Sequence, residues 1–371
     1  MAATKARAYL SPTLVLLALD WPDGEARNDF LGFAIQRTPG FLNLSTNVRE
    51  ASSWLPNRLG FSGPPPEGQP DFPSDKAPVQ KFMWWDARFE GLAPANNLQY
   101  DVWAVVGDSK TPQLDPGSQA TLTVNLPPHV EFGIGTWFNR AVMSSQAFSR
   151  KVAALNLNGA APSAAQALDL RQWLANSMEK PIPDFVAKAA GSNSAIAGAI
   201  YHLTDNLWII PALQVAMENC PIELVYDSHE TVDSKTKKKL PSPNEGAIAT
   251  LSNVTFDARD KTKIMHNKFI VESDESGAKP KPIRVACGSA NYTTEGLTSQ
   301  ANLIHTFEAP GLADLYHQRF LAIKGNPTLG KTAAGAAWSD TVSVGDTGIR
   351  VFYSPEKGKP NVDRGDRKSV V

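Results

Sequence analysis

The chain of 371 residues lacks several features that would place it in a specialised class of protein. It has only two cysteines, Cys220 and Cys287, which are too few for a disulfide-dense secreted scaffold. Both lie in apolar surroundings, so free thiols are expected, with a single disulfide as the alternative. The formal net charge is −1, so no overall positive charge draws the chain to nucleic acid or membranes. Any attraction for anions must therefore be local.

No apolar run is long enough to cross a bilayer. The apolar run at residues 10 to 19 lacks a small-residue cleavage site and leads directly into the turn residues 20 to 24. We therefore predict a strand there rather than a signal peptide, which favours a cytoplasmic location without deciding it. The six histidines are not at metal-ligand spacing, and no Cys-x-x-Cys or His-Glu-x-x-His motif occurs. We expect neither a metal nor a cofactor.

Residues 1 to 128 consist of short apolar runs separated by turns rich in proline and glycine, with no helical periodicity. The runs are residues 14–19, 30–35, 82–85, 100–106 and 120–126. This pattern predicts an all-β sandwich. The run at residues 98 to 106, followed by a Leu-Asp-Pro-Gly turn at 114 to 117, is similar to the late strands of fibronectin type III domains. Pro127 and Pro128 mark a boundary, because paired prolines cannot continue a strand ladder.

From residue 129 to 325 helical and strand patterns alternate, which predicts an α/β lobe with a mixed sheet flanked by helices. Helices are expected at residues 141–154, 163–178, 208–217 and 309–323, and strands at 199–205 and 222–227. The lysine-rich stretch within residues 229 to 247 is expected to be an exposed loop. Residues 326 to 371 are interpreted as a linker and the start of a second, truncated lobe, with a strand at 348–355.

The central motif is His266-Asn267-Lys268, inside an apolar run that predicts a buried strand. Because strand side chains alternate, Ile264, His266 and Lys268 would share one face, with the imidazole and the ammonium about 7 Å apart. A neutral imidazole beside a fixed cation suits a phosphate ligand. The alternative is a strand histidine satisfied by a neighbour, but Lys268 would then be a buried ammonium without a purpose.

About twenty residues later a second apolar run ends in Gly288-Ser289-Ala290-Asn291. Gly288 permits a close turn of the backbone, and Ser289 and Asn291 supply a hydroxyl and an amide. By themselves these are ordinary turn residues. Beside His266 and Lys268 they complete a cradle for an anion.

His-x-Lys followed by Gly-Ser-x-Asn resembles the phospholipase D superfamily, over roughly residues 131 to 325. Where that family has an aspartate, this chain has Ser273, flanked by Glu272 and Asp274. The resemblance implies a metal-independent phosphodiesterase that acts through a covalent phosphohistidine. In that reading His266 is the nucleophile, Lys268 its cationic partner, and Gly288, Ser289 and Asn291 bind the phosphate.

Four other residues are weaker candidates for the site. Glu272 has the alternation of His266 and would orient its imidazole, and His305 would be a second proton-transfer group. Asn139 and Arg140 lie in a tract, residues 135 to 151, that resembles a block found in bacterial phospholipase D-like proteins. We expect them at the edge of the pocket, although an ordinary strand-loop-helix is the alternative.

Only one complete motif is visible, whereas the family normally brings two histidines together. A homodimer with a shared site, a missing second half, or a degenerate lobe would each explain this. The rival function is a binding module in which the β-sandwich acts and the lobe has lost activity. Phospholipid and nucleic acid both remain open as the phosphodiester substrate.

Overall fold

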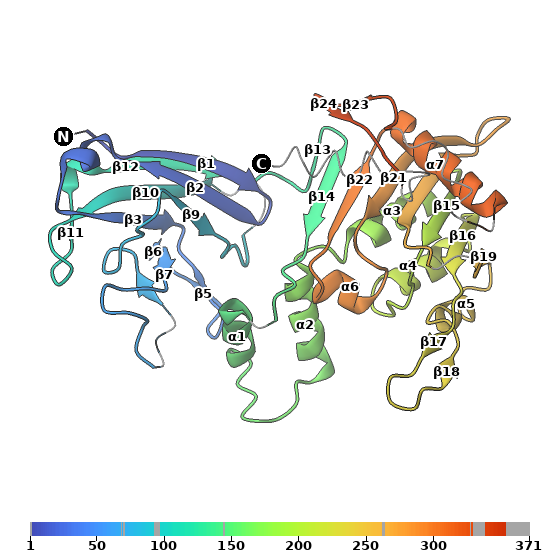
Figure 1. The fold of residues 1–371 in the computed structure, drawn as a ribbon, viewed down its shortest axis with the longest axis horizontal. Coiled ribbons are helices and arrows are strands. Elements are labelled where there is room, and N and C mark those ends of the chain that lie inside the picture. The colour runs from blue at the N-terminus through green and yellow to red at the C-terminus, as the bar shows by residue number, and fades with distance from the viewer. Residues whose placement is uncertain are drawn as a thin grey trace. The chain divides into compact units, whose positions relative to one another are not determined.

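The computed structural model describes residues 2 to 353, apart from 68, 70, 93–96, 144, 262–263, 327 and 329–337. The chain divides into two compact units, drawn in Figure 1. Unit 1 comprises Met1–His129 and Ser144–Ala161, and unit 2 comprises Val130–Met143 and Pro162–Val371. Each unit has its own apolar core.

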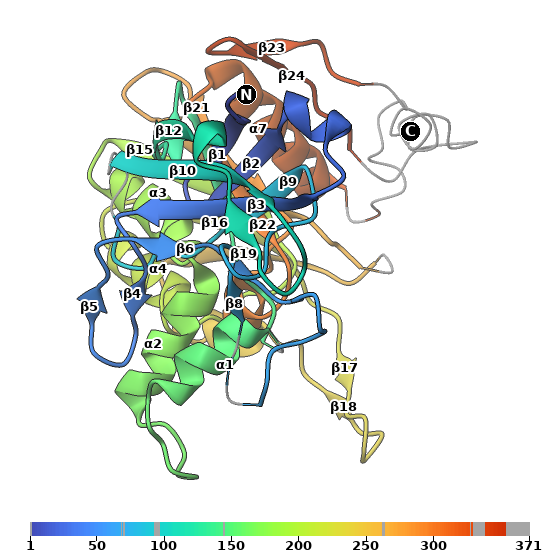
Figure 2. The ribbon, with the colours of Figure 1, turned by 90° about the vertical axis from the view of Figure 1, so that its left-hand side faces the viewer.

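Unit 1 is built from two antiparallel sheets. The first contains β1 (Lys5–Ser11), β2 (Leu14–Asp20) and β9 (Met83–Asp86). The second contains β3 (Phe30–Thr38), β6 (Ser53–Trp54), β10 (Asn97–Val106), β11 (Gln113–Leu114) and β12 (Ala120–Asn125). Figure 2 labels β3, β6, β10 and β12 of this sheet. Alternation along β2 and β10 turns every second side chain inward, so that Val15 and Leu17 share a core with Tyr100 and Val102.

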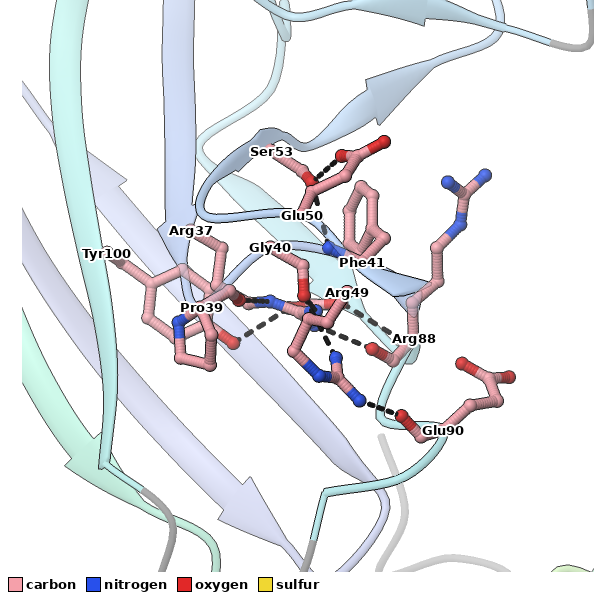
Figure 3. Close-up of polar contacts among 11 residues, drawn as sticks. Arg37, Pro39, Gly40, Phe41, Arg49, Glu50, Ser53, Arg88, Glu90 and Tyr100 are labelled. Carbon is pink, nitrogen blue, oxygen red and sulfur yellow. Dashed lines mark hydrogen bonds and ion pairs between the residues drawn. The ribbon is translucent and has the colours of Figure 1, made fainter. Parts of the chain in front are cut away.

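A buried polar network ties the two sheets of unit 1 together. Arg37 on β3 is fully buried and pairs with Asp86 on β9 at 2.9 Å, while the Tyr100 hydroxyl on β10 donates to the same carboxylate at 2.8 Å. Figure 3 shows the Arg37 guanidinium donating to backbone carbonyls, including that of Gly40 at 2.9 Å. Because every partner is satisfied, this buried cation stabilises one arrangement of the sheets.

The remaining elements of unit 1 are short. They are η1 (Pro22–Ala26), β4 (Leu42–Asn43), β5 (Val48–Arg49), β7 (Pro56–Asn57), β8 (Phe72–Pro73), η2 (Pro116–Ser118) and α1 (Gln146–Ala153). Helix α1 begins after Ser145, whose side chain accepts a hydrogen bond from the Phe148 backbone. The helix predicted from residue 141 therefore starts five residues later, at this N-cap.

Unit 2 contains an eight-stranded mixed sheet. Its strands, in spatial order, are β13 (Val130–Glu131), β14 (Ile134–Phe138), β22 (Leu303–Phe307), β21 (Lys281–Gly288), β20 (Lys268–Asp274), β15 (Ser194–Ile200), β16 (Ile222–Asp227) and β19 (Val254–Arg259). Strands β15, β16 and β19 are parallel, and the other neighbours are antiparallel. The predicted fold class, a β-rich N-terminal region followed by a mixed sheet with helices, is confirmed.

Helices cover both faces of this sheet. Helices α3 (Pro181–Ala190) and α4 (Ile209–Ala216) pack with Ile200 and Ile270 on one face. Helix α7 (Pro310–Gly325) packs with Phe269 on the other. The smaller elements are α2 (Ala164–Ala175), α5 (Glu245–Ile248), α6 (Thr294–Thr298), and the strand pairs β17 (Thr231–Val232) with β18 (Lys239–Leu240) and β23 (Val342–Val344) with β24 (Thr347–Ile349).

Several local predictions can be compared with these elements. Cys220 and Cys287 are free thiols, as expected. The four lysines between 235 and 239 are exposed, and β17 and β18 pair on either side of most of them. The exposed loop predicted for 229 to 247 was too long, because Ser242 and Asn244 are buried and α5 begins at Glu245. The strand expected at 348–355 was wrong in extent, because β24 ends at Ile349 after pairing with β23; residues beyond 353 lie outside the described part. Among the described residues, no helix is both long and apolar enough to span a bilayer.

Candidate active site

The two sequence motifs meet at one edge of the unit 2 sheet. Lys268, the first residue of β20, lies opposite Ile200, the last residue of β15. Its neighbour Phe269 lies opposite Cys287, just before Gly288 at the end of β21. Strand β16 runs parallel to β15 and ends at Asp227. The same sheet edge therefore collects residues from four strands that are distant in the sequence.

His266 precedes the strand instead of belonging to it. Strand β20 begins only at Lys268, and Ile264 is 49% exposed, so the predicted shared strand face of Ile264, His266 and Lys268 was wrong. The cause is local: the Met265 backbone N–H donates to Asp227 Oδ2 at 2.7 Å and not to a neighbouring strand. The segment that carries His266 is held by a carboxylate.

Lys268 is a buried ammonium without a carboxylate partner among the residues that the structure describes. Its residue is 6% exposed, and Nζ donates to the carbonyl oxygen of His266 at 2.9 Å. The ammonium also lies 5.1 Å from the centre of the Tyr201 ring. Burial lowers the pKa of Lys268 to about 8. An anionic ligand would offset this cost of desolvation.

The His266 imidazole is exposed at the same edge, with its ring centre 5.0 Å from that of Tyr201. Burial lowers the pKa of His266, the charge of Lys268 lowers it further, and the charge of Asp227 raises it. The first two effects prevail, so the imidazole is neutral near pH 7. A neutral imidazole has the lone pair that a nucleophile needs.

The Gly288-Ser289-Ala290-Asn291 turn is fixed against the start of β22. The Ser289 backbone N–H donates to the Leu303 carbonyl at 3.1 Å, and Ser289 Oγ accepts from the Leu303 N–H at 3.0 Å. A Cβ on Gly288 would lie 2.2 Å from the Leu303 carbonyl oxygen, so only glycine fits there. Asn291 Oδ1 is buried and has no partner within the described part of the chain. This oxygen is an acceptor, so any hydrogen bond from Asn291 to a phosphate would have to come from Nδ2 of the same amide.

Sequence reasoning missed three residues of this edge. Tyr201 and His202 follow β15, and Asp227 ends β16. The rings of Tyr201 and His202 stack with centres 3.9 Å apart. Asp227 is 3% exposed and also accepts a hydrogen bond from His229 Nδ1 at 3.0 Å. The available signal was position, because residues at the carboxyl ends of parallel strands gather at one edge.

The structure does not bring Glu272 to His266. Glu272 lies farther along β20, where it pairs with the Arg284 guanidinium and accepts from the Ser194 hydroxyl at 2.8 Å. His305 also lies elsewhere: its Nδ1 contacts the Thr136 hydroxyl at 3.0 Å, and its ring packs near Phe307 on the α7 face. Side chains alternate along β20, so Lys268 lies with Ile270 on the face that α3 and α4 cover, opposite to the face of His305. Neither Glu272 nor His305 contacts the imidazole of His266.

Asn139 and Arg140 are engaged in holding loops together. Asn139 Nδ2 donates to the Gln300 carbonyl at 2.6 Å, and its Oδ1 accepts from the Asn302 backbone at 3.1 Å. Arg140 donates to the Trp173 carbonyl at 2.6 Å and stacks on that indole at 4.2 Å. These contacts fix the loop after α6 and the end of α2.

The described residues contain no group of three or more histidine, cysteine, aspartate or glutamate side chains that could hold a metal ion. Residues 325 to 332 match the Gly-x-x-x-x-Gly-Lys-Thr pattern of a nucleotide phosphate loop. That loop normally joins a strand to a following helix, whereas this one follows helix α7. Residues 327 and 329–337 of this stretch lie outside the described residues.

Three solved structures show similarity to part of the chain. The phospholipase D family member Nuc from Salmonella typhimurium matches with 17% identity, over 36% of this chain and 80% of its own, at a TM-score of 0.28. NucT from Helicobacter pylori matches with 17% identity, over 37% and 82%, at 0.26. Polyphosphate kinase from Porphyromonas gingivalis matches with 13% identity, over 50% and 30%, at 0.31. A comparison with protein-family models finds no match, and neither does a comparison with curated proteins.

Proposed function

We propose that this chain is a metal-independent phosphodiesterase of the phospholipase D type, which cleaves a P–O bond through a phosphohistidine at His266. The observation that carries the proposal is Lys268, a buried ammonium without a carboxylate partner among the described residues, next to a neutral imidazole. A phosphodiester would supply the missing negative charge. Hydrolysis and transfer to an alcohol differ only in the second acceptor.

Each residue of the edge has a role in this mechanism. His266 attacks phosphorus, and Lys268 balances the charge that gathers on the non-bridging oxygens. The Asn291 amide and the Ser289 hydroxyl donate to those oxygens. Gly288 lets the turn pack against Leu303, where no side chain fits, and so positions Ser289 and Asn291.

In this proposal Asp227 is the carboxylate that orients and charges the surroundings of His266, a role for which the family motif has an aspartate at the position of Ser273. Ser273 is 4% exposed and lies five residues beyond Lys268, about 17 Å along the strand. Asp227, in contrast, holds the residue before His266 and raises the pKa of that imidazole by its charge. The departure from the motif is therefore compatible with activity.

The test is turnover of bis(p-nitrophenyl) phosphate in the presence of EDTA. We expect activity in the wild type, none above background in His266→Ala, and normal activity in His317→Ala. His317 is a matched control because its ring stacks near Phe320 on helix α7. Strict dependence on a divalent ion, or activity in His266→Ala, would reject the mechanism. Complete inactivity of a folded wild type would favour the alternative, a degenerate lobe whose β-sandwich binds a ligand.

The substrate class is a separate question. Wild-type protein should be offered a phospholipid in mixed micelles and single-stranded DNA under the same conditions. Release of the head-group alcohol would identify a phospholipase, and shortening of the DNA would identify a nuclease. Each readout should disappear in His266→Ala.

A further inference from the structure

His202 is the second histidine at this edge of the sheet, and its backbone links the two motifs. The Tyr292 N–H, one residue beyond Asn291, donates to the His202 carbonyl at 3.0 Å. The next residue, Leu203, forms a parallel bridge with Tyr292. His202 is therefore fixed between the strand that begins at Lys268 and the turn that ends at Asn291.

The His202 ring belongs to a group of polar side chains around Tyr201. It stacks on the Tyr201 ring with centres 3.9 Å apart and planes 18° apart. The same Tyr201 ring lies 5.0 Å from the His266 ring and 5.1 Å from Lys268 Nζ. Two imidazoles and one ammonium thus gather around a single aromatic side chain.

The ring nitrogens of His202 are available to a substrate. They make no hydrogen bond to any residue that the structure describes, and the residue is partly exposed. The other nearby imidazoles differ, since Nδ1 of His229 contacts Asp227 at 3.0 Å and Nδ1 of His305 contacts Thr136 at 3.0 Å. Of His202, His229 and His305, His202 is thus the best placed to exchange a proton with a ligand held by Lys268.

The charges around His202 favour a proton donor whose protonated form is stabilised by bound substrate. Burial lowers the pKa of His202, the neighbouring Lys268 and His266 lower it further, and Asp227 raises it. A bound phosphodiester adds a negative charge beside the ring and neutralises Lys268. Both changes raise the pKa of His202 and so favour its protonated form when the substrate is bound.

We propose that His202 is the general acid that protonates the leaving oxygen in the reaction proposed above, on which this inference rests. The His266 nitrogen forms a bond to phosphorus while the P–O bond to the leaving group breaks. The proton passes from His202 to that oxygen and an alcohol departs. Water then gives a proton to His202 and attacks phosphorus, the N–P bond breaks, and both histidines return to their starting states.

The inference makes one lobe sufficient for catalysis. The sequence shows a single His-x-Lys motif, which left a shared site in a homodimer as one explanation. With His202 as the acid, no histidine from a second copy is required. Specific activity should then be the same at concentrations where light scattering detects only monomer, and activity that disappears on dissociation would overturn the proposal.

The decisive experiment compares two leaving groups in the His202→Gln variant. Bis(p-nitrophenyl) phosphate releases a stable anion that needs no proton, whereas a dialkyl diester such as thymidylyl-thymidine releases a basic alkoxide. We expect His202→Gln to lose about 10²–10³-fold in kcat on the dialkyl diester and less than about tenfold on the nitrophenyl ester. Retained nitrophenyl turnover shows at the same time that the variant is folded.

Controls separate failure of this inference from failure of the proposed function. His229→Gln and His305→Gln should affect both esters alike. Equal losses on both esters in folded His202→Gln would assign His202 a structural role and overturn the inference, while a phosphoryl adduct on His266 would leave the proposed function standing. If His202→Gln does not fold, His202→Asn with the same two esters provides the test.

Discussion

The backbone N–H of Met265 donates to Oδ2 of Asp227 at 2.7 Å, and this bond fixes the segment that carries His266. Asp227→Asn keeps an oxygen acceptor but removes the charge that raises the pKa of His266. We expect the pKa of His266 to fall, so the acid limb of the kcat/KM profile should move to lower pH. Asp227→Ala should lose at least about tenfold in kcat, because the segment loses its anchor. An acid limb that does not move in Asp227→Asn would contradict this account.

Lys268→Met should abolish turnover and stabilise the fold. The folded pKa of about 8 lies below the unfolded value of 10.5, so the cost of burying the ammonium is complete below pH 8 and disappears above pH 10.5. We expect a gain on the order of 2 kcal/mol at pH 7, after allowance for partial exposure to water. Thermal unfolding at pH 7 and pH 10 measures it, with exposed Lys235→Met as control. A variant that is less stable at pH 7 would show that the ammonium is compensated.

The same pKa predicts how activity depends on pH. Free enzyme needs a charged Lys268 and a neutral His266, so kcat/KM should fall above about pH 8 and below the lowered pKa of the imidazole. A profile of kcat/KM against pH with the nitrophenyl ester measures both limbs. Activity that keeps rising through pH 9 would exclude Lys268 as the essential cation.

Gly288→Ala should disturb the phosphate-binding turn. The added Cβ would lie 2.2 Å from the Leu303 carbonyl oxygen, which is backbone and cannot turn aside. We expect a loss of about 1–3 kcal/mol in stability and a drop in kcat, because Ser289 and Asn291 move with the turn. Gly246→Ala is the matched control, since nothing lies within 4 Å of its added Cβ. Full activity in Gly288→Ala would remove this turn from the mechanism.

Ser273→Asp restores the family aspartate near the end of β20 that is farther from Lys268. Ser273 is 4% exposed on β20, so a carboxylate there would be buried without a partner. We expect a loss of about 3–5 kcal/mol by urea unfolding and no gain in activity. Ser276→Asp, at an exposed position, should be nearly neutral. Higher activity in Ser273→Asp would mean that Asp227 does not fill the carboxylate role.

The sequence predicted the fold class and most of the strands because hydrophobic alternation is a local signal. Residues 14–19 and 30–35, for example, fall within β2 and β3. It missed helix α3, whose first turn contains Pro181 and Pro183 and therefore has the composition of a loop. The resemblance of residues 98 to 117 to fibronectin type III strands stays a prediction.

The candidate site was predicted only in part, for the same reason. His266, Lys268 and the Gly-Ser-x-Asn turn form local patterns. Tyr201, His202 and Asp227 reach the site only because β15 lies beside β20 and β16 lies beside β15. No single segment of the sequence specifies this order of strands. Glu272 and His305 illustrate the converse: alternation and residue type suggested roles, but their partners are Arg284 and Thr136.

The most direct test of the central claim is to trap the covalent intermediate. Wild-type protein should be mixed with bis(p-nitrophenyl) phosphate, quenched rapidly without acid, digested and analysed by mass spectrometry. We predict a phosphoryl adduct on His266 in the wild type and none in His266→Ala. An adduct on Ser289 or on another residue, or turnover without any adduct on His266, would contradict the assignment of the nucleophile and with it the proposed phosphodiesterase mechanism.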